Sequence, residues 1–370
     1  MVLLNIAYYT FIIVVSIQLI YYLFLFSKFA FLNPKHKTQK NIALSILICA
    51  KNEAKNLKNY LPHILNQEYP DFEIILINDN SHDKTLDIME DFAAKHRNIK
   101  IVNVIPTETF YGNKKYALTL GIKAAKNEYL VFTDADCKPN SNHWLKEIST
   151  NFSNTKSIVL GYGAYAKIKN SFLNKLIRFE TLLTALQYFS YAKSGIPFMG
   201  VGRNLAYKKE VFFNANGFIN HMQIRSGDDD LFINQVANTK NTSICFTKES
   251  FTISNPKTTF KDWILQKRRH VSTANYYKAG HKILLALFYI SQFLFYTLAI
   301  TLFITTYAWQ IVLPIFILRL IVFYIVFGKT SKKLEEKDLI IFLPFLEIFL
   351  IGMQLVIFII NFIAKPKYWK

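Results

Sequence analysis

The order of apolar and polar positions divides the chain into an alternating central part and long apolar runs near both ends. Between residues 43 and 166, short apolar runs alternate with amphipathic runs that have helical spacing. We expect strands at 44–48, 73–77, 99–105 and 129–132, and helices at 56–67, 83–96, 114–126 and 141–152. Ser141 or Asn142 would cap the last of these helices. This alternation predicts an α/β fold with a mostly parallel sheet and helices on both faces.

The region after residue 166 contains a helix, a glycine-rich turn and an acidic cluster. Apolar side chains recur at helical spacing over residues 170–193, and residues 195–204 are rich in glycine. Asp228, Asp229 and Asp230 open a second helix, which we expect to end at Ala237. Residues 260–282 are basic, aromatic and amphipathic, and they precede an apolar run. Such a segment is typical of the membrane interface.

Four apolar runs approach the length needed to cross a bilayer, namely residues 6–26, 283–307, 311–327 and 339–363. The first run lacks the positive start and cleavage site of a signal peptide, so we expect it to stay as a membrane helix. Basic residues follow it at Lys28, Lys35, Lys37 and Lys40. By the positive-inside tendency, the central domain then lies on the cytoplasmic side of the inner (plasma) membrane.

Four crossings leave one conflict at the end of the chain. Lys365, Lys367 and Lys370 would lie outside, against the same tendency, unless one run is re-entrant or the span count is wrong. Arg319 and Glu347 lie within the last two runs. Because charges inside a membrane usually pair or face a polar cavity, we expect these two residues to be in contact.

Composition narrows the classes of protein to consider. The 370 residues are 52% hydrophobic, include 33 Phe and 21 Tyr, and carry a formal charge of +19. The basic residues gather beside apolar runs, which favours an anionic membrane surface and argues against a nucleic-acid partner. Cys49, Cys137 and Cys245 lack metal-site spacing, so we expect free thiols in a reducing compartment.

Polar clusters follow three of the predicted strands, at residues 49–53, 78–83 and 133–136. Ligands of parallel α/β sheets bind beyond the carboxyl ends of the strands, so these clusters should meet at one edge. Asp134 and Asp136 would repel each other unless a cation joined them, and Mg²⁺ or Mn²⁺ could bind them together with a substrate diphosphate. Helix-start and turn chemistry is an alternative explanation for Glu53, Asp79 and Asp83.

Two later clusters also suggest chemistry. Three consecutive aspartates exceed what a helix cap requires, and their mutual repulsion could raise the pKa of one toward use as a general base. Gln266 and Arg269 share a helix face and could bind a diphosphate. Anchoring at the membrane interface explains at least part of the same segment.

The order of these motifs resembles that of the membrane-bound family 2 glycosyltransferases, which have the GT-A (nucleotide-diphospho-sugar transferase) fold. The resemblance extends over about residues 45–277, and it adds one N-terminal and about three C-terminal membrane helices. The motifs that carry it occupy residues 50–53, 77–85, 112–118, 133–136, 227–231 and 266–270. It implies that a membrane helix at 1–28 and a basic linker at 29–42 precede a catalytic domain at 43–256. An interfacial segment at 257–282 and membrane helices at 283–370 would follow this domain.

The resemblance also implies roles for single residues. It assigns the nucleotide's base and ribose to Ala50, Glu53 and Asp79, the diphosphate to Lys114, the nucleotide-sugar to Asp134, and the metal to Asp136 with Asp134. It places the general base within Asp228–Asp230. Matching the Gly-Asp-Asp pattern gives Asp229, which we prefer, whereas matching the Asp-Leu pair gives Asp228.

One element departs from the family pattern. Gln266 and Arg269 match the family's Q-x-x-R-W element, but His270 replaces the tryptophan, which in the family helps to form the acceptor site. The resemblance implies an inverting glycosyltransferase that uses a nucleotide-sugar, a UDP-sugar before a GDP-sugar, and a lipid-linked or polysaccharide acceptor. The alternatives are a processive polysaccharide synthase, a non-catalytic nucleotide-binding membrane scaffold and, least favoured, a transporter.

Overall fold

The computed structural model describes residues 1–34, 38, 40–105, 114–224 and 226–363. Within this part, the chain forms two compact units. The membrane-helix unit comprises the described residues of Met1–Asn33, Lys169–Ser194 and Thr259–Pro366. The sheet unit comprises those of Pro34–Ile168 and Gly195–Thr258.

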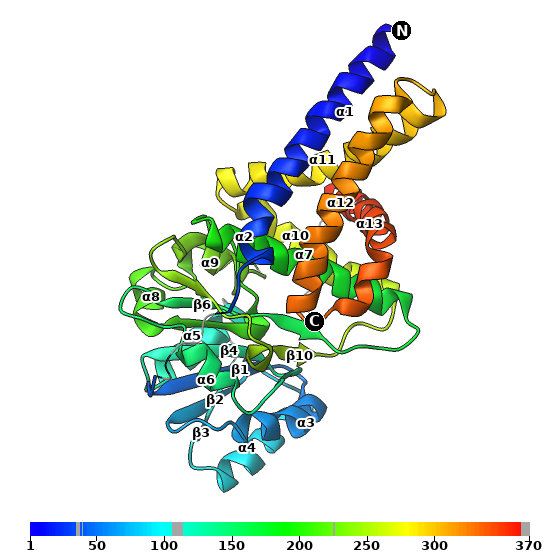
Figure 1. Ribbon diagram of the computed structural model, residues 1–370. Helices are drawn as coiled ribbons and strands as arrows, with labels where there is room; N and C mark the ends of the chain where they lie inside the picture. Colours follow the sequence, from blue (N-terminus) through cyan, green and yellow to red (C-terminus); the bar gives the residue numbers. More distant parts are fainter. Residues whose placement is uncertain (35–37, 39, 106–113, 225, 364–370) are drawn as a thin grey trace. The chain divides into compact units, whose positions relative to one another are not determined.

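The main sheet has seven strands among the described residues, in the order β3-β2-β1-β4-β8-β6-β9 (Figure 1). The strands are β1 Leu44–Ala50, β2 Phe72–Asn78, β3 Ile99–Asn103, β4 Tyr129–Asp134, β6 Ile158–Leu160, β8 Leu205–Lys208 and β9 Thr242–Ile244. β3, β2, β1 and β4 are parallel, β8 is antiparallel to β4 and β6, and β6 is parallel to β9. The predicted mostly parallel α/β sheet is confirmed.

Successive side chains of β1 point to opposite faces of the sheet, and nearly all of them are buried. Helices therefore cover both faces. The helices of the first half are α3 Ala54–Leu65, α4 Thr85–Lys95, α5 Lys114–Ala124 and α6 Trp144–Ser149. On one face, Ile46 packs in a cluster with Leu57 of α3. On the other, Gly121 of α5 lies so close to the sheet that an added Cβ would be 2.2 Å from Ile77 Cδ1 and 3.5 Å from Leu47 Cδ2.

The α6 helix is shorter than the sequence predicted. It begins at Trp144 after an N-cap at His143 and ends at Ser149. The Ser141 hydroxyl accepts a hydrogen bond of 3.0 Å from the backbone N–H of His143, so it closes a turn before the helix. The prediction that Ser141 or Asn142 caps this helix was wrong, because the chain uses these residues in that turn.

A second, smaller sheet lies at the end of β4. Its strands are β5 Cys137–Pro139, β7 Gly163–Tyr165 and β10 Thr252–Ser254, in the order β5-β10-β7 among the residues described. β10 is antiparallel to β5 and parallel to β7. The remaining elements of the sheet unit are α8 Lys209–Asn214, α9 Asp230–Val236, and the 3₁₀ turns η2 Gly202–Asn204, η3 Ile219–His221 and η4 Lys248–Ser250.

The membrane-helix unit contains the apolar helices predicted near both ends. Its elements are α1 Val2–Ile20, the π-helical turn η1 Tyr21–Phe26, α2 Ser27–Ala30, α7 Phe172–Lys193, α10 Phe260–Thr273, η5 Ala274–Tyr276, α11 Ala279–Ile304, α12 Trp309–Lys333, η6 Lys337–Phe342 and α13 Leu343–Ile363. In the part of the chain that is described, four segments are long and apolar enough to cross a membrane: Val2–Ala30, Ala279–Ile304, Trp309–Lys333 and Lys337–Ile363. Their number and order agree with the prediction, whereas Lys365, Lys367 and Lys370 lie outside the described residues, as do Lys35 and Lys37.

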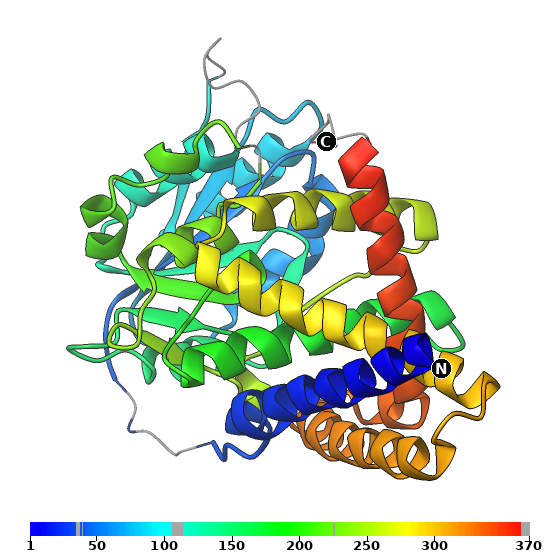
Figure 2. The same cartoon turned by 90° about the horizontal axis from the view of Figure 1, so that it is seen from above.

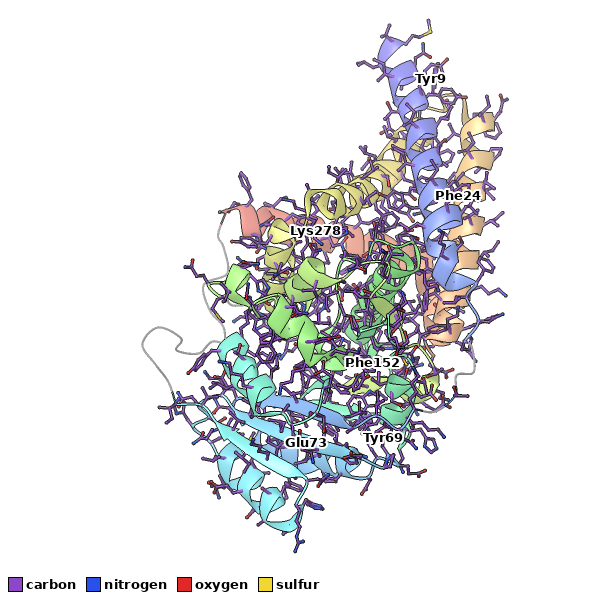
Figure 3. All side chains as sticks on the ribbon, turned by 90° about the vertical axis from the view of Figure 1, so that its left-hand side faces the viewer. Tyr9, Phe24, Tyr69, Glu73, Phe152 and Lys278 are labelled. Carbon is purple, nitrogen blue, oxygen red and sulfur yellow. The ribbon has the colours of Figure 1, made fainter. Side chains whose placement is uncertain are left out.

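Within this unit, α1 lies beside α11 and α12 (Figures 1 and 2). Tyr9 and Phe24 project outward from the N-terminal span (Figure 3), and they are 63% and 69% exposed. Exposed aromatic side chains on an apolar helix are suited to contact with lipid. The middle of the chain contributes α7, which contacts α2 and α13. Packing therefore groups α7 with the membrane helices, while the assignment of residues 43–256 to catalysis stays a prediction.

The predicted contact between Arg319 and Glu347 is confirmed. The Arg319 Nη1 atom lies 2.8 Å from Glu347 Oε2, and both side chains are buried. The guanidinium also donates to Gln18 Oε1 at 2.5 Å and to the Tyr22 hydroxyl at 3.1 Å, and Gln292 Nε2 donates to Glu347 Oε1 at 2.9 Å. All four spans therefore contribute to this Arg319–Glu347 cluster.

Candidate active site

The carboxyl ends of β1, β2 and β4 meet at one edge of the main sheet. In the parallel register, Ala50 pairs with Asn78 and Cys49 pairs with Asp134. The polar clusters that follow these strands are therefore neighbours, as the sequence predicted. Cys49, Cys137 and Cys245 are free thiols, also as predicted.

The loops that follow β1 and β2 are joined by hydrogen bonds. The backbone N–H of His82 donates to Asn52 Oδ1 at 2.8 Å, and that of Asn52 donates to Ser81 Oγ at 3.0 Å. Asp83 Oδ2 accepts from the backbone N–H of Ala54 at 3.3 Å. Asp83 therefore serves the turn, which was the alternative explanation for it, and the two loops form one rim.

Three residues predicted to bind the nucleotide lie on this rim. The backbone N–H of Asp79 donates to Ala50 O at 2.9 Å, and Glu53 Oε2 accepts from Asn56 Nδ2 at 2.6 Å. The Asp79 side chain is buried, and burial raises its pKa against the opposing effect of Lys51 and Lys114. A buried carboxyl of this kind gains from a hydrogen-bond donor that reaches it from a ligand.

Lys114, at the start of α5, joins two acidic clusters that are distant in the sequence. Its Nζ atom lies 3.1 Å from Asp134 Oδ1 and 3.0 Å from Asp228 Oδ2. Burial alone would lower the pKa of Lys114, but the two carboxylates raise it well above its ordinary value. Gly112 and Asn113, which precede it in the same motif, lie outside the described residues.

The aspartates of the acidic triplet have different environments. Asp229, the N-cap of α9, accepts from the backbone N–H groups of Gly202 at 2.6 Å and Asp230 at 2.7 Å. Burial, together with Asp228 and Asp230, raises the pKa of Asp229 to about 7. Burial would also raise the pKa of Asp228, but its ion pair with Lys114 lowers it below the ordinary value. One carboxyl of the triplet is thus paired, while another can gain or lose a proton near neutral pH.

A pocket lies between these groups. Polar groups from the end of β4, the start of α5 and the triplet line it, together with apolar side chains. The lining includes Lys114, Asp134, Asp228, Asp229, Gly202, Leu118 and Tyr207. The pocket therefore brings together the predicted diphosphate, donor and base residues.

The candidate metal ligands form a compact group. One ligand atom each from Asp134, Asp136 and Cys137 lies within 4.8 Å of the others. Burial raises the pKa of the Cys137 thiol well above its ordinary value, and this thiol donates to Asp136 Oδ1 at 3.4 Å. A protonated thiol is a poor ligand for a hard cation, whereas two carboxylates suit one. The donor set fits Mg²⁺ or Mn²⁺ bound through Asp134 and Asp136.

No sequence pattern predicted two further cations beside this pocket, the half-buried Arg203 and the buried Lys115. Arg203 Nη1 donates to Ser254 Oγ at 2.7 Å, and Lys115 Nζ donates to the carbonyl oxygens of His221 at 2.6 Å and Ile224 at 2.8 Å. The hydrogen-bond partners of these two side chains are at least 39 residues away in the chain, so no local pattern could reveal them. The only signals were a lone arginine in a glycine-rich turn and a second lysine after Lys114.

Gln266, Arg269 and His270 belong to α10 in the membrane-helix unit. Gln266 and Arg269 are half-buried, and His270 is exposed. The two half-buried residues are three positions apart, so they share one face of the helix, as the sequence predicted. Their role toward a donor stays a prediction.

Comparison with known families agrees with this arrangement of motifs. A model of "Glycosyl transferase family 2" matches residues 45–215, and a model of "Glycosyl transferase family group 2" matches residues 134–361, more than half of the chain. The chain belongs to the family 2 glycosyltransferases. Membership explains why the polar clusters occur in this order along the chain.

Curated relatives of this family 2 glycosyltransferase differ in their products. The poly-beta-1,6-N-acetyl-D-glucosamine synthase of Staphylococcus epidermidis is 37% identical over 121 residues, which cover 32% of this chain and 28% of that one. The dolichyl N-acetyl-alpha-D-glucosaminyl phosphate 3-beta-D-2,3-diacetamido-2,3-dideoxy-beta-D-glucuronosyltransferase of Methanococcus voltae is 30% identical over 165 residues, covering 41% and 49%. The match spans less than half the length of each relative.

The fold extends beyond the region of sequence similarity. A mannosyltransferase from Pyrobaculum calidifontis, solved in complex with GDP-Man and Mn²⁺, superposes with a TM-score of 0.59. It is 17% identical, and the superposition covers 89% of this chain and 98% of that one. At this identity the likeness shows a shared GT-A fold.

Proposed function

We propose that this family 2 glycosyltransferase moves a sugar from a nucleotide-diphosphate sugar to an acceptor hydroxyl at the cytoplasmic face of the inner membrane, with inversion at the anomeric carbon. The observation that carries the proposal is the division of the pocket's carboxyls. Asp228 is paired with Lys114, whereas the pKa of Asp229 is raised to about 7. Such a pocket can accept a proton and, with a divalent cation on its carboxylates, could hold an anionic donor beside that proton acceptor.

The donor would lie across the carboxyl edge of the sheet. We assign the base and ribose to Ala50, Glu53 and Asp79, and the diphosphate to Lys114. A divalent cation held by Asp134 and Asp136 would offset the charge that develops on the leaving diphosphate. The donor complex of the structurally similar mannosyltransferase, with GDP-Man and Mn²⁺, supports a nucleotide-sugar and a metal in general. We favour a UDP-sugar with Mg²⁺ or Mn²⁺, and a GDP-sugar is the second choice.

Asp229 would act as the general base in a single displacement. The acceptor oxygen forms a bond to the anomeric carbon while the bond from that carbon to the diphosphate oxygen breaks, and the electron pair leaves with the diphosphate. The acceptor's proton passes to the Asp229 carboxylate. Gly202 and Asp230 hold this carboxylate in place through their backbone N–H groups. One base without a carboxylate nucleophile predicts inversion.

The acceptor would be lipid-linked or a glycan. The Methanococcus voltae relative is named for a dolichyl phosphate-linked acceptor, and the Staphylococcus epidermidis relative for a polymer product. The second name favours a processive polysaccharide synthase as the alternative function. His270 in place of the family's tryptophan favours a single addition, with Gln266 and Arg269 assigned to the donor's diphosphate. A non-catalytic scaffold would have no use for a proton acceptor in the pocket.

A donor panel tests this proposal. The full chain, purified in detergent with Mn²⁺, should release nucleoside diphosphate from at least one UDP- or GDP-sugar. Asp136→Asn should abolish the release, whereas Asp91→Asn, a matched change at an exposed aspartate of α4, should not alter it. The enzyme proposal fails if no donor is consumed and Asp136→Asn binds nucleotide as tightly as the wild type.

A further inference from the structure

The 3₁₀ turn η2 fixes Arg203 beside the strand that carries the candidate metal ligands. The Arg203 carbonyl oxygen accepts from Thr133 Oγ1 at 3.0 Å and from Thr252 Oγ1 at 2.9 Å. Thr133 directly precedes Asp134 on β4, and Phe132 of β4 pairs with Leu205 of β8. The backbone of Arg203 therefore lies level with the carboxyl end of β4.

The Arg203 side chain is held within the second sheet. Its Nη1 atom donates to Ala164 O at 3.1 Å and to Ser254 Oγ at 2.7 Å, and the guanidinium lies 4.1 Å from the centroid of the Tyr165 ring. Ser254 pairs with Cys137 in the β10–β5 register, and Cys137 directly follows Asp136. The guanidinium is therefore fixed on the side of the pocket where Asp136 lies.

Room for this side chain comes from a glycine. A Cβ added at Gly163 would lie 3.1 Å from Arg203 Cβ and 3.3 Å from Arg203 Cζ. A larger residue at this position of β7 would push the arginine from its place. The contacts with Ala164, Ser254 and Tyr165, together with this space, hold the half-buried guanidinium in one position.

The neighbouring charges leave Asp136 in need of compensation. Within the described residues, the ion pairs of Lys114 are with Asp134 and Asp228. The guanidinium of Arg203 is bound to Ser254, opposite Cys137, and so places its charge beside the segment that carries Asp136.

We propose that Arg203 is a positioning residue that provides the Asp134–Asp136 pair with a permanent counter-charge, and that it keeps the affinity of the nucleotide-free protein for a divalent cation low. This inference rests on the proposed function. Arginine stays protonated throughout the physiological range, so its charge always opposes the cation. When a diphosphate binds, the same charge attracts it, so the cation and the donor bind together. Arg203 would thereby couple metal binding to donor binding.

Titration with Mn²⁺ followed by electron paramagnetic resonance tests the coupling without measuring turnover. The full chain in detergent is titrated alone, with UDP and with GDP. Wild-type protein should bind Mn²⁺ weakly alone and at least tenfold more tightly with one of the nucleotides. Arg203→Gln should bind Mn²⁺ alone about tenfold more tightly than the wild type, since a unit charge at a partly buried site changes binding by about this much.

Two variants separate charge from packing. Arg203→Lys keeps the charge and should retain the weak binding. Ser254→Ala removes one hydrogen bond of the guanidinium without changing its charge, and it should bind Mn²⁺ like the wild type. A purely structural role for Arg203 predicts the opposite sign, because a disturbed site would bind Mn²⁺ less well in Arg203→Gln.

The inference is overturned if Arg203→Gln binds Mn²⁺ no more tightly than the wild type, or if Ser254→Ala tightens binding equally. If Arg203→Gln does not fold, Arg203→Met provides a second neutral variant. The inference is also overturned if the wild-type protein binds Mn²⁺ equally tightly with and without nucleotide. Wild-type protein that binds no Mn²⁺ under any condition refutes the metal in the proposed function itself. The two failures can be told apart. If nucleotide tightens Mn²⁺ binding equally in the wild type and in Arg203→Gln, the inference about Arg203 fails while the metal in the proposed function stands.

Discussion

The Arg319–Glu347 cluster and the acidic pocket both bury charge, but they hold it in opposite ways. In the cluster, Arg319 and Glu347 contact each other, and neutral side chains from the other two spans donate to or accept from them. In the pocket, carboxyls outnumber cations. Lys114 is shared by Asp134 and Asp228, and Asp229 accepts hydrogen bonds from the backbone N–H groups of Gly202 and Asp230.

This difference separates a structural group of charges from a functional one. A buried ion pair whose hydrogen bonds are satisfied fixes how helices pack, and removing one partner is costly. A buried carboxyl among other carboxyls is unfavourable for folding, and its raised pKa is typical of sites that bind ligands or move protons. The two regions should therefore respond differently to the same kind of substitution.

The largest expected effect is on catalysis in the pocket. Asp229→Asn should lower kcat by about 10²–10⁴-fold, because it removes the carboxyl that we propose as the acceptor's general base. Donor binding and the free energy of unfolding should be unchanged or improved, because a repelled carboxyl is removed. Nucleoside diphosphate release, calorimetry with the donor and thermal unfolding measure the three quantities. Asp228→Asn is the matched variant: it should mainly raise KM for the donor, since Lys114 loses a partner. An equal loss of kcat in the two variants would contradict the assignment of different roles to Asp228 and Asp229.

In the membrane-helix cluster, the same kind of change should act on stability. Arg319→Met leaves the Glu347 carboxylate buried without its partner, and we expect the free energy of unfolding to fall by about 3–5 kcal/mol. The double variant Arg319→Met/Glu347→Met should recover much of the loss. Denaturant unfolding in micelles gives both values. A double variant as unstable as the single one would mean that packing, rather than the pair, determines stability here.

Lys115 is a cation near the pocket that we expect to stabilise the fold. Its ammonium donates to the carbonyl oxygens of His221 and Ile224, in the segment that precedes the acidic triplet. Lys115→Met removes both donors, and we expect a loss of about 1–3 kcal/mol in stability. Thermal unfolding measures the loss, with Lys123→Met at the end of α5 as an exposed control. Equal melting temperatures for both variants would contradict this role.

The smallest effect concerns pH. Because the pKa of Asp229 is raised to about 7, its carboxylate is available as a base above that pH, and kcat/KM should fall about tenfold for each unit below it. Stability should move in the opposite direction. The folded state holds this proton up to about pH 7, whereas the unfolded state loses it near the ordinary value of 3.8, so the contribution of Asp229 to stability declines as pH rises through this window. A value of kcat/KM that does not change from pH 5.5 to 8.5 would contradict the role of Asp229 as the base.

Much of the sheet unit could be predicted from the sequence because its signals are local. An apolar run followed by a polar cluster indicates both a parallel strand and the edge where ligands bind, and the ends of β1, β2 and β4 meet as expected. Arg319 and Glu347 could be paired in advance because charges inside apolar runs are rare. Gln18 and Gln292 went unnoticed, since a neutral amide in an apolar run gives little warning.

Other features depend on contacts that no local pattern encodes. Arg203 and Lys115 acquire their meaning from strands and turns far along the chain, and α7 reads as an ordinary apolar helix although it packs with the membrane helices. Asp229 was already preferred over Asp228 from the motif match, and the structure adds an argument for this preference that no local pattern could supply. This argument depends on which carboxyl Lys114 reaches and which one faces the backbone N–H of Gly202.

The anomeric configuration of the product shows most directly whether one carboxyl, Asp229, activates the acceptor in a single displacement. Once a donor is found, the first product can be collected under initial-rate conditions and the coupling constant of its anomeric proton measured by nuclear magnetic resonance. A single displacement, with the acceptor attacking opposite the diphosphate, predicts that an α-linked nucleotide-sugar gives a β-linked product. An α-linked product would require a covalent intermediate or a front-face reaction, and would contradict it.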